Sequence, residues 1–206
     1  SPQWTRTRLC RLLRSYFEQK QQTAAVGPVR VGTDVVFYYD PADRLARVTP
    51  DLYVLPGVGY EEQLRSFKVY ERKRTPSLVL HIVEAPVSPE DGLMRHFLRL
   101  GCEDVVLYDP QWFLQPATAL KGRRLLVHYE RQPSRTSSGL DGPPVMRAQP
   151  LSHPGRVYLK RHGLWLVHRG AADLRIYADP RYVGAPDELP IEAALFPLPE
   201  ERKHAH

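Results

Sequence analysis

The chain has 206 residues, of which 42% are hydrophobic and 25% are charged. These proportions fit one globular domain, or a domain with a small extension, and argue against a disordered chain. The formal net charge is +6, and arginine supplies most of the positive charge. Guanidinium groups bind phosphate and carboxylate through paired hydrogen bonds, so the charge permits a nucleic-acid or acidic-protein partner without requiring one.

The two cysteines, Cys10 and Cys102, lie far apart and form no C-x-x-C pair. This spacing argues against a disulfide framework and against a zinc knuckle, and it favours a reducing, cytoplasmic setting. No apolar run approaches the roughly 20 residues needed to cross a bilayer, and the first residues lack the apolar core of a signal peptide. We therefore expect a cytoplasmic protein without a membrane span.

The first part of the chain predicts one helix and then several strands. Apolar residues recur at helical spacing from Trp4 to about Gln22, with arginines around the other side, which indicates an amphipathic helix. Apolar runs bounded by turn residues then predict three strands, over Asp34–Asp40, Asp51–Leu55 and Ser77–Val83.

A strand, a helix and another strand follow in close order. Ser88 can cap a helix that runs from about Pro89 to Leu100 and stops at Gly101. The short apolar run Glu103–Pro110 predicts the next strand. This order indicates a βαβ unit with a right-handed crossover.

The later chain changes in composition. A further strand is expected over 122–130, and the segment 131–155 is rich in proline, glycine and serine, which predicts a flexible loop. Beyond it, "RVYLKR", "LWLVHR" and "DLRIYADP" predict a meander of short strands. The chain has no P-loop, G-x-G-x-x-G, G-x-S-x-G or H-E-x-x-H motif, which removes the commonest nucleotide-binding, hydrolase and zinc-protease interpretations.

The stretch "SLVLHIVEAPVSPED" places two polar residues, His81 and Glu84, on or next to a buried strand. Metal-dependent phosphodiester cleavage needs two acidic groups to hold a divalent cation, and usually a lysine or a similar base. Magnesium prefers oxygen ligands, so acidic residues at the ends of neighbouring strands are the expected arrangement. Asp51, which opens a strand after "VTP", meets the first requirement.

Several motifs in this order resemble one family. "VTPDLYVLPG", then "TPSLVLHIVEAPVSPED", then a helix ending in glycine and "VVLYDP", are similar to the Uma-two family of restriction endonucleases, in the PD-(D/E)xK superfamily. The similarity continues in "HGLWLVHRGAADLRIYADP", so it covers the chain from about residue 1 to 180. Each motif alone is weak, and their shared order carries the match.

The resemblance implies an α/β fold with a restriction-endonuclease-like core, made of an N-terminal helix, a mixed central sheet and a crossover helix, with a C-terminal β-meander. Residues 1–130 would form the nuclease-like core, 131–155 the flexible loop, and 156–206 the meander and tail of the same domain. The implied activity is hydrolysis of DNA with magnesium or manganese.

The resemblance also implies site residues, one position at a time. Asp51 matches the first acid. One alignment places His81 at the second acid, and the spacing to Asp91 and Arg95 then matches the family's helical aspartate and lysine. Counting back from the glycine that ends the helix instead places Leu93 at the lysine position.

A second alignment slides the strand by three residues and makes Glu84 the second acid. Histidine binds manganese or zinc better than magnesium, and arginine stays protonated, so Arg95 cannot act as a general base. Simpler roles remain open: His81 as a hydrogen-bonded core residue, Asp51 as a turn group, and Glu84 and Arg95 as solvent-facing residues.

Two functions follow from these alternatives. The first is a divalent-metal DNA endonuclease in which Asp51 and His81 or Glu84 hold the metal, Arg95 contacts the scissile phosphate, and Arg8 and Arg11 of the first helix contact nucleic acid. The second is an inactive nuclease-fold protein that serves as a binding or structural subunit of a larger complex. A second carboxylate beside Asp51 favours the first, and a hydrogen-bonded His81 without such a carboxylate favours the second.

Overall fold

The computed structural model describes residues 2–23, 27–83, 90–112, 124–136, 138–139, 141–151, 153–170, 173–178 and 194–195. Its helices are α1 (Pro2–Thr23), α2 (Val69–Arg72) and α3 (Glu90–Leu100). Its strands are β1 (Val29–Gly32), β2 (Val36–Tyr38), β3 (Arg47–Val48), β4 (Leu52–Pro56), β5 (Ser66–Lys68), β6 (Leu78–Ile82), β7 (Asp104–Tyr108), β8 (Leu126–Arg135), β9 (Asp141–Ala148), β10 (Arg156–Leu159), β11 (Leu164–His168), β12 (Leu174–Ala178) and β13 (Ala194–Leu195).

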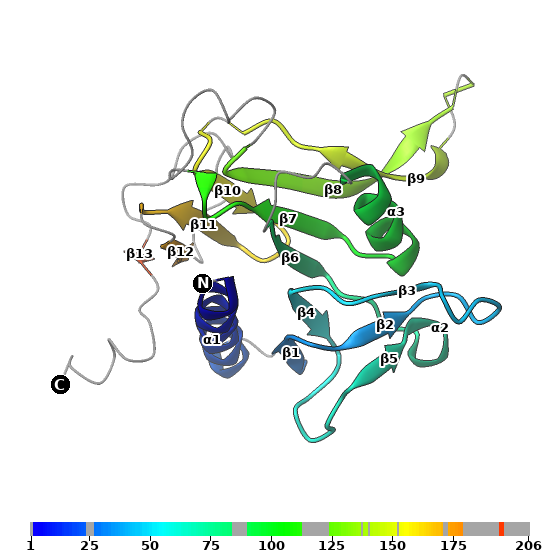
Figure 1. Ribbon diagram of the computed structural model, residues 1–206, viewed down its shortest axis with the longest axis horizontal. Coiled ribbons are helices and arrows are strands. Elements are labelled where there is room, and N and C mark those ends of the chain that lie inside the picture. Colours follow the sequence, from blue (N-terminus) through cyan, green and yellow to red (C-terminus); the bar gives the residue numbers. More distant parts are fainter. Residues whose placement is uncertain are drawn as a thin grey trace.

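A six-stranded mixed sheet forms the centre of the fold, in the order β1-β4-β6-β7-β8-β9 (Figure 1). Strands β6 and β7 are parallel and are connected through α3, whereas the other neighbours in this sheet are antiparallel. Strands β10 to β12 form the expected antiparallel meander, which β13 extends. The α/β class with a mixed sheet is thus confirmed.

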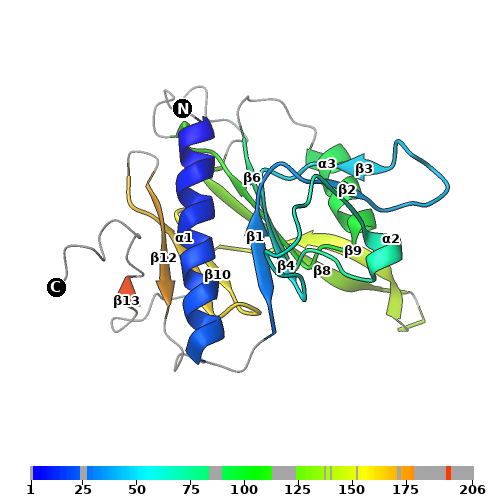
Figure 2. The same ribbon diagram turned by 90° about the horizontal axis from the view of Figure 1, so that it is seen from below.

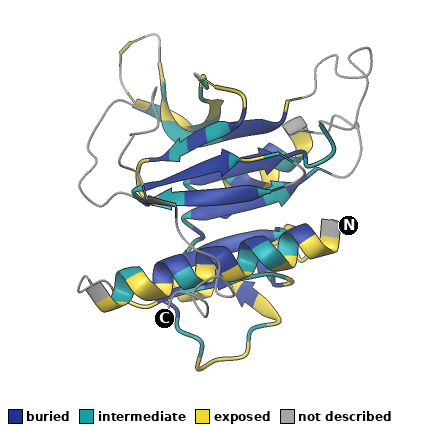
Figure 3. Cartoon of the chain, turned by 90° about the vertical axis from the view of Figure 1, so that its left-hand side faces the viewer, coloured by how far each residue is buried: buried dark blue, intermediate teal, exposed yellow. Residues whose placement is uncertain are grey.

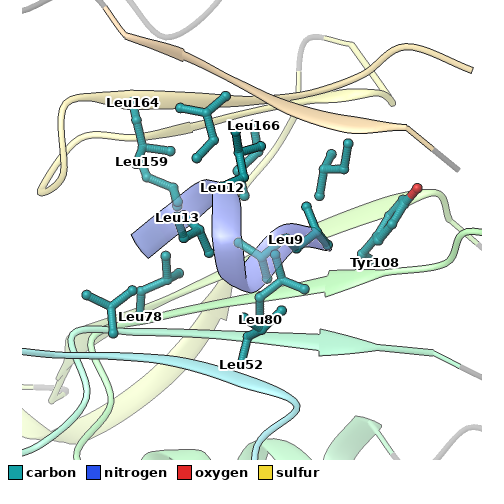
Figure 4. Close-up of a cluster of buried hydrophobic side chains, with 14 of the residues drawn as sticks. Leu9, Leu12, Leu13, Leu52, Leu78, Leu80, Tyr108, Leu159, Leu164 and Leu166 are labelled. Carbon is teal, nitrogen blue, oxygen red and sulfur yellow. The ribbon is translucent and has the colours of Figure 1, made fainter. Parts of the chain in front are cut away.

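The two faces of the central sheet pack against different partners. Along β4, Leu52 and Val54 belong to one hydrophobic cluster and Tyr53 and Leu55 to the other, as expected when successive side chains point to opposite faces. Helix α1 lies between the first face and the meander (Figures 2 and 4). Its Leu9, Leu12 and Leu13 meet leucines of both layers: Leu52, Leu78, Leu80, Leu159, Leu164 and Leu166.

The second face is covered by α3 and by a small three-stranded sheet of order β3-β2-β5. Phe97 of α3 and Phe37 and Phe67 of the small sheet are buried against it. Figure 3 shows the resulting pattern on α1, whose inner side is buried while its outer side is exposed.

The prediction of a flexible loop over 131–155 is wrong for most of that segment. It holds the end of β8 and all of β9, which pair as a hairpin with a shift in register between Pro133 and Arg135. The prolines predicted a loop because proline has no backbone N–H to donate to a neighbouring strand. Pro143 and Pro144 lie on β9, which is an edge strand, and an edge strand leaves one row of backbone groups unpaired.

Other short elements were not expected. Strands β1 and β5 and the single-turn helix α2 have four residues or fewer, too short for a periodic signal. None of the helices in the described part of the chain is long and apolar enough to cross a membrane.

Candidate functional site

Asp51 and His81 lie opposite each other at one end of the central sheet. Asp51 directly precedes β4, and His81 is the fourth residue of β6. The antiparallel register pairs Leu52 with Leu80, so the next position along brings Asp51 beside His81. Pairing between strands therefore joins two residues that are thirty positions apart in the sequence.

One oxygen of Asp51 makes both of its short contacts. Oδ2 lies 2.6 Å from His81 Nδ1 and accepts a hydrogen bond of 2.9 Å from the backbone N–H of Ile82. The contact with Nδ1 has the length of a hydrogen bond, but its angles fall outside hydrogen-bond geometry, so it is a close polar contact. The bond to Ile82 N–H ties the carboxylate to the end of β6.

The pair is half-buried. The side chains of His81 and Asp51 are 31% and 24% exposed, while His81 Nδ1 itself is buried. The exposed area of His81 therefore comes from its other atoms. A carboxylate against Nδ1 favours the tautomer with its proton on that nitrogen, which leaves Nε2 as the acceptor. Such a pair can orient an imidazole, or offer one oxygen and one nitrogen to a bound ion.

Burial would raise the pKa of Asp51, but its neighbours reverse that effect. The contact with His81 and the hydrogen bond from Ile82 N–H both favour the carboxylate, and the charge of Arg6 adds to them, so the pKa is lowered below its ordinary value. Arg6 belongs to α1, and its charge acts on Asp51 from there. Its Nη1 lies 3.2 Å from Asp34 Oδ1. Sequence reasoning missed Arg6 because no local pattern connects it to β4.

The described residues around Asp51 do not form the ligand set that magnesium prefers. Over the described ranges, no three side chains of His, Cys, Asp or Glu lie close enough together to hold a metal. The neighbour that the structure places against Asp51 is an imidazole, whereas magnesium requires mainly oxygen ligands. Glu84, the alternative second acid, lies outside the described residues.

The predicted basic residues do not gather around the pair. Arg95 is exposed on α3 and has no hydrogen bond or ion pair with any described residue. Arg8 is held in an ion pair, with its Nη1 2.6 Å from Asp173 Oδ1. Arg11 is exposed on α1. The side chain of Asp91 lies outside the described residues, so its match to the family's helical aspartate stays a prediction.

A second Asp–His pair, which the sequence analysis did not identify, lies on β7 and β8. Asp104 Oδ1 lies 2.7 Å from His128 Nε2, and both side chains are buried. Arg161, in the turn between β10 and β11, approaches Asp104 Oδ2 at 3.4 Å and also pairs with Glu103 and Glu130. This cluster ties the meander to the central sheet.

Neither a scan against models of protein families nor a search of curated proteins returned a match for this chain.

Proposed function

We propose that this protein is a nuclease-fold protein of the Uma-two type that does not hydrolyse DNA with magnesium and acts as a binding or structural subunit. The observation that carries the proposal is the 2.6 Å contact between Asp51 Oδ2 and His81 Nδ1. In the family, the residue opposite the first acid is a second acid. An imidazole at that place gives Asp51 a close polar partner in place of a second carboxylate.

The remaining features support the same proposal. The lowered pKa of Asp51 means that its carboxylate is charged near neutral pH, and His81, Ile82 N–H and Arg6 already stabilise that charge. Arg95, which one alignment places at the family's lysine, stays protonated and cannot take a proton from water, and the alternative, Leu93, has no ionisable group. A carboxylate whose charge is already stabilised by protein groups fits a structural role better than a metal-binding role.

A manganese-dependent endonuclease is the second candidate. One observation favours it. Asp51 and His81 meet at a partly exposed end of β4 and β6, where they place an oxygen and a nitrogen ligand close together. Manganese accepts imidazole more readily than magnesium does. In this case the protein would cleave DNA with manganese and be inactive with magnesium.

A plasmid-nicking assay separates the two functions. The wild-type protein and Asp51→Ala would be incubated with supercoiled DNA in magnesium and, separately, in manganese. We expect no nicking that depends on Asp51 in magnesium. Nicking in manganese that disappears in Asp51→Ala would establish the second candidate, and the same result in magnesium would contradict the proposal. Cleavage by both proteins alike would indicate a contaminating nuclease.

A restoration experiment tests whether His81 occupies the acid position. His81→Glu places a second carboxylate opposite Asp51, so we expect magnesium to raise the melting temperature of this variant and to leave the wild type unchanged. His96→Glu is the matched control, because it makes the same substitution at an exposed histidine on α3. If magnesium stabilises both variants equally, or neither, the assignment of His81 to the acid position is wrong.

A further inference from the structure

The three-stranded sheet has two different faces. Its inner face carries Phe37 and Phe67, which are buried in the second hydrophobic cluster. Its outer face carries a row of polar and aromatic residues, because side chains alternate along each strand. The register pairs Tyr38 with Arg47 on one side and with Lys68 on the other. Tyr38 therefore lies between two cations on the solvent side of the sheet.

The contacts in this row agree with that placement. Arg47 Nη1 donates to Tyr38 Oη across 3.5 Å, a weak bond that leaves the guanidinium mostly uncommitted. Lys68 Nζ lies 2.8 Å from Glu71 Oε1, although its side chain remains 51% exposed. The hydrogen bond that Lys68 donates to Glu71 is the main reason that the pKa of Lys68 is raised, and the charge of nearby Arg44 acts against it.

The turn between β2 and β3 adds an exposed apolar residue to this surface. Leu45 is 78% exposed, which is unusual for a large aliphatic side chain in the described part of the chain. Arg44 and Arg47 flank it. The adjacent acid, Asp43, is engaged in the turn, since its Oδ1 accepts the backbone N–H of Leu45 at 2.8 Å.

We propose that this outer face, formed by Tyr38, Arg44, Leu45, Arg47 and Lys68, binds single-stranded nucleic acid. A base would stack on Tyr38, and the phosphates on either side would lie against the three cations. A duplex keeps its bases stacked inside, so it would use the cations and leave Tyr38 unused. An acidic protein segment would likewise not require a flat aromatic ring.

This surface is distinct from the Asp51–His81 pair. Figure 1 shows β2, β3 and β5 side by side, and this small sheet packs on the second face of the central sheet, whereas Asp51 and His81 lie at one end of β4 and β6. The inference does not depend on whether the protein cleaves DNA. It instead supplies a partner that a non-hydrolysing protein could bind.

Fluorescence anisotropy with a labelled oligothymidine of about 12 nucleotides tests the proposal. We expect Tyr38→Ala to weaken binding at least about fivefold, because stacking of one base is worth roughly 1–3 kcal/mol. Tyr38→Phe keeps the ring and should remain within about twofold of the wild type. The double variant Arg47→Gln, Lys68→Gln should weaken binding and reduce the slope of affinity against salt by about 0.7 per charge removed.

The matched controls use similar residues elsewhere. Tyr177→Ala removes a partly exposed tyrosine from β12, and Arg147→Gln removes an exposed arginine from β9, so both should bind as the wild type does. Asp51→Asn should also bind normally, which separates this surface from the proposed function. The proposal is overturned if the wild type does not bind at low salt, if folded Tyr38→Ala binds as tightly as the wild type, or if the controls lose as much affinity.

Discussion

The protein contains two Asp–His pairs with nearly the same separation and very different surroundings. Asp51 and His81 are 2.6 Å apart with side chains 24% and 31% exposed, whereas Asp104 and His128 are 2.7 Å apart with side chains 4% and 9% exposed. The first pair lies at one end of β4 and β6, two inner strands of the central sheet. The second is enclosed by the sheet and the turn that carries Arg161.

This contrast shows that burial, and not distance, separates a candidate site from a structural pair. Removing one partner of a buried charge pair leaves the other desolvated and unpaired, which is costly. At the more exposed Asp51–His81 pair, solvent can replace a lost partner, so we expect a substitution there to cost less stability. Such a position can lose or gain a chemical function at a smaller cost to the fold.

The largest expected effect comes from Asp104→Ala. Because this change leaves His128 buried without its partner and removes a contact of Arg161, we expect the free energy of unfolding to fall by about 3 kcal/mol or more. Urea denaturation of the variant and of Asp51→Ala measures the comparison. Equal losses for the two variants would show that burial does not distinguish the pairs.

The next largest effect is expected in acid, where protonation of the buried His162 should weaken the turn between β10 and β11. Burial lowers the pKa of His162 to about 4. The unfolded state binds this proton near pH 6.5, whereas the folded state does not bind it until about pH 4. The free energy of unfolding is therefore unaffected by His162 above about pH 6.5 and falls by about 3 kcal/mol between pH 6.5 and pH 4. Unfolding measured across this range should show a flatter slope in His162→Gln. The exposed His153→Gln serves as control, and an unchanged slope in His162→Gln would refute the assignment.

The smallest effect concerns Asp51, and it appears at lower pH. Its folded pKa is lowered, so its contribution is present above the unfolded value near 3.9 and is lost as the pH falls through the folded value. We expect Asp51→Asn to cost about 1 kcal/mol at pH 7 and almost nothing near pH 2. The difference in unfolding free energy between wild type and variant, measured against pH, gives the result. A difference that grows in acid would have the wrong sign.

Much of the architecture was predictable because it rests on local patterns. The apolar spacing of α1, the glycine that ends α3, and the apolar runs of β4, β6 and β7 all appear in the sequence as the structure has them, within a few residues, whereas the predicted cap at Ser88 lies outside the described residues. The hairpin of β8 and β9 was not predictable, because Pro143 and Pro144 fit a strand only where it lies at the edge of a sheet, as β9 does. Edge position is a property of the whole sheet.

The candidate site, like the fold, was predictable only in part. The sequence places Asp51 at the start of a strand and His81 within another, and it identifies both as unusual. It left open whether His81 or Glu84 is the partner of Asp51. It also gave no sign of Arg6 near Asp51, of the pair formed by Asp104 and His128, or of the row formed by Arg47, Tyr38 and Lys68.

The sequence by itself determined the order and type of the main elements and the chemical identity of the groups at their ends. Only the tertiary structure decided which of those groups meet. Strand register brings residues together across thirty positions at Asp51 and His81, and it places a tyrosine between cations from two other strands. The physical reason is that periodicity depends on a few neighbouring residues, whereas register depends on how the strands, α1 and α3 together bury two hydrophobic clusters.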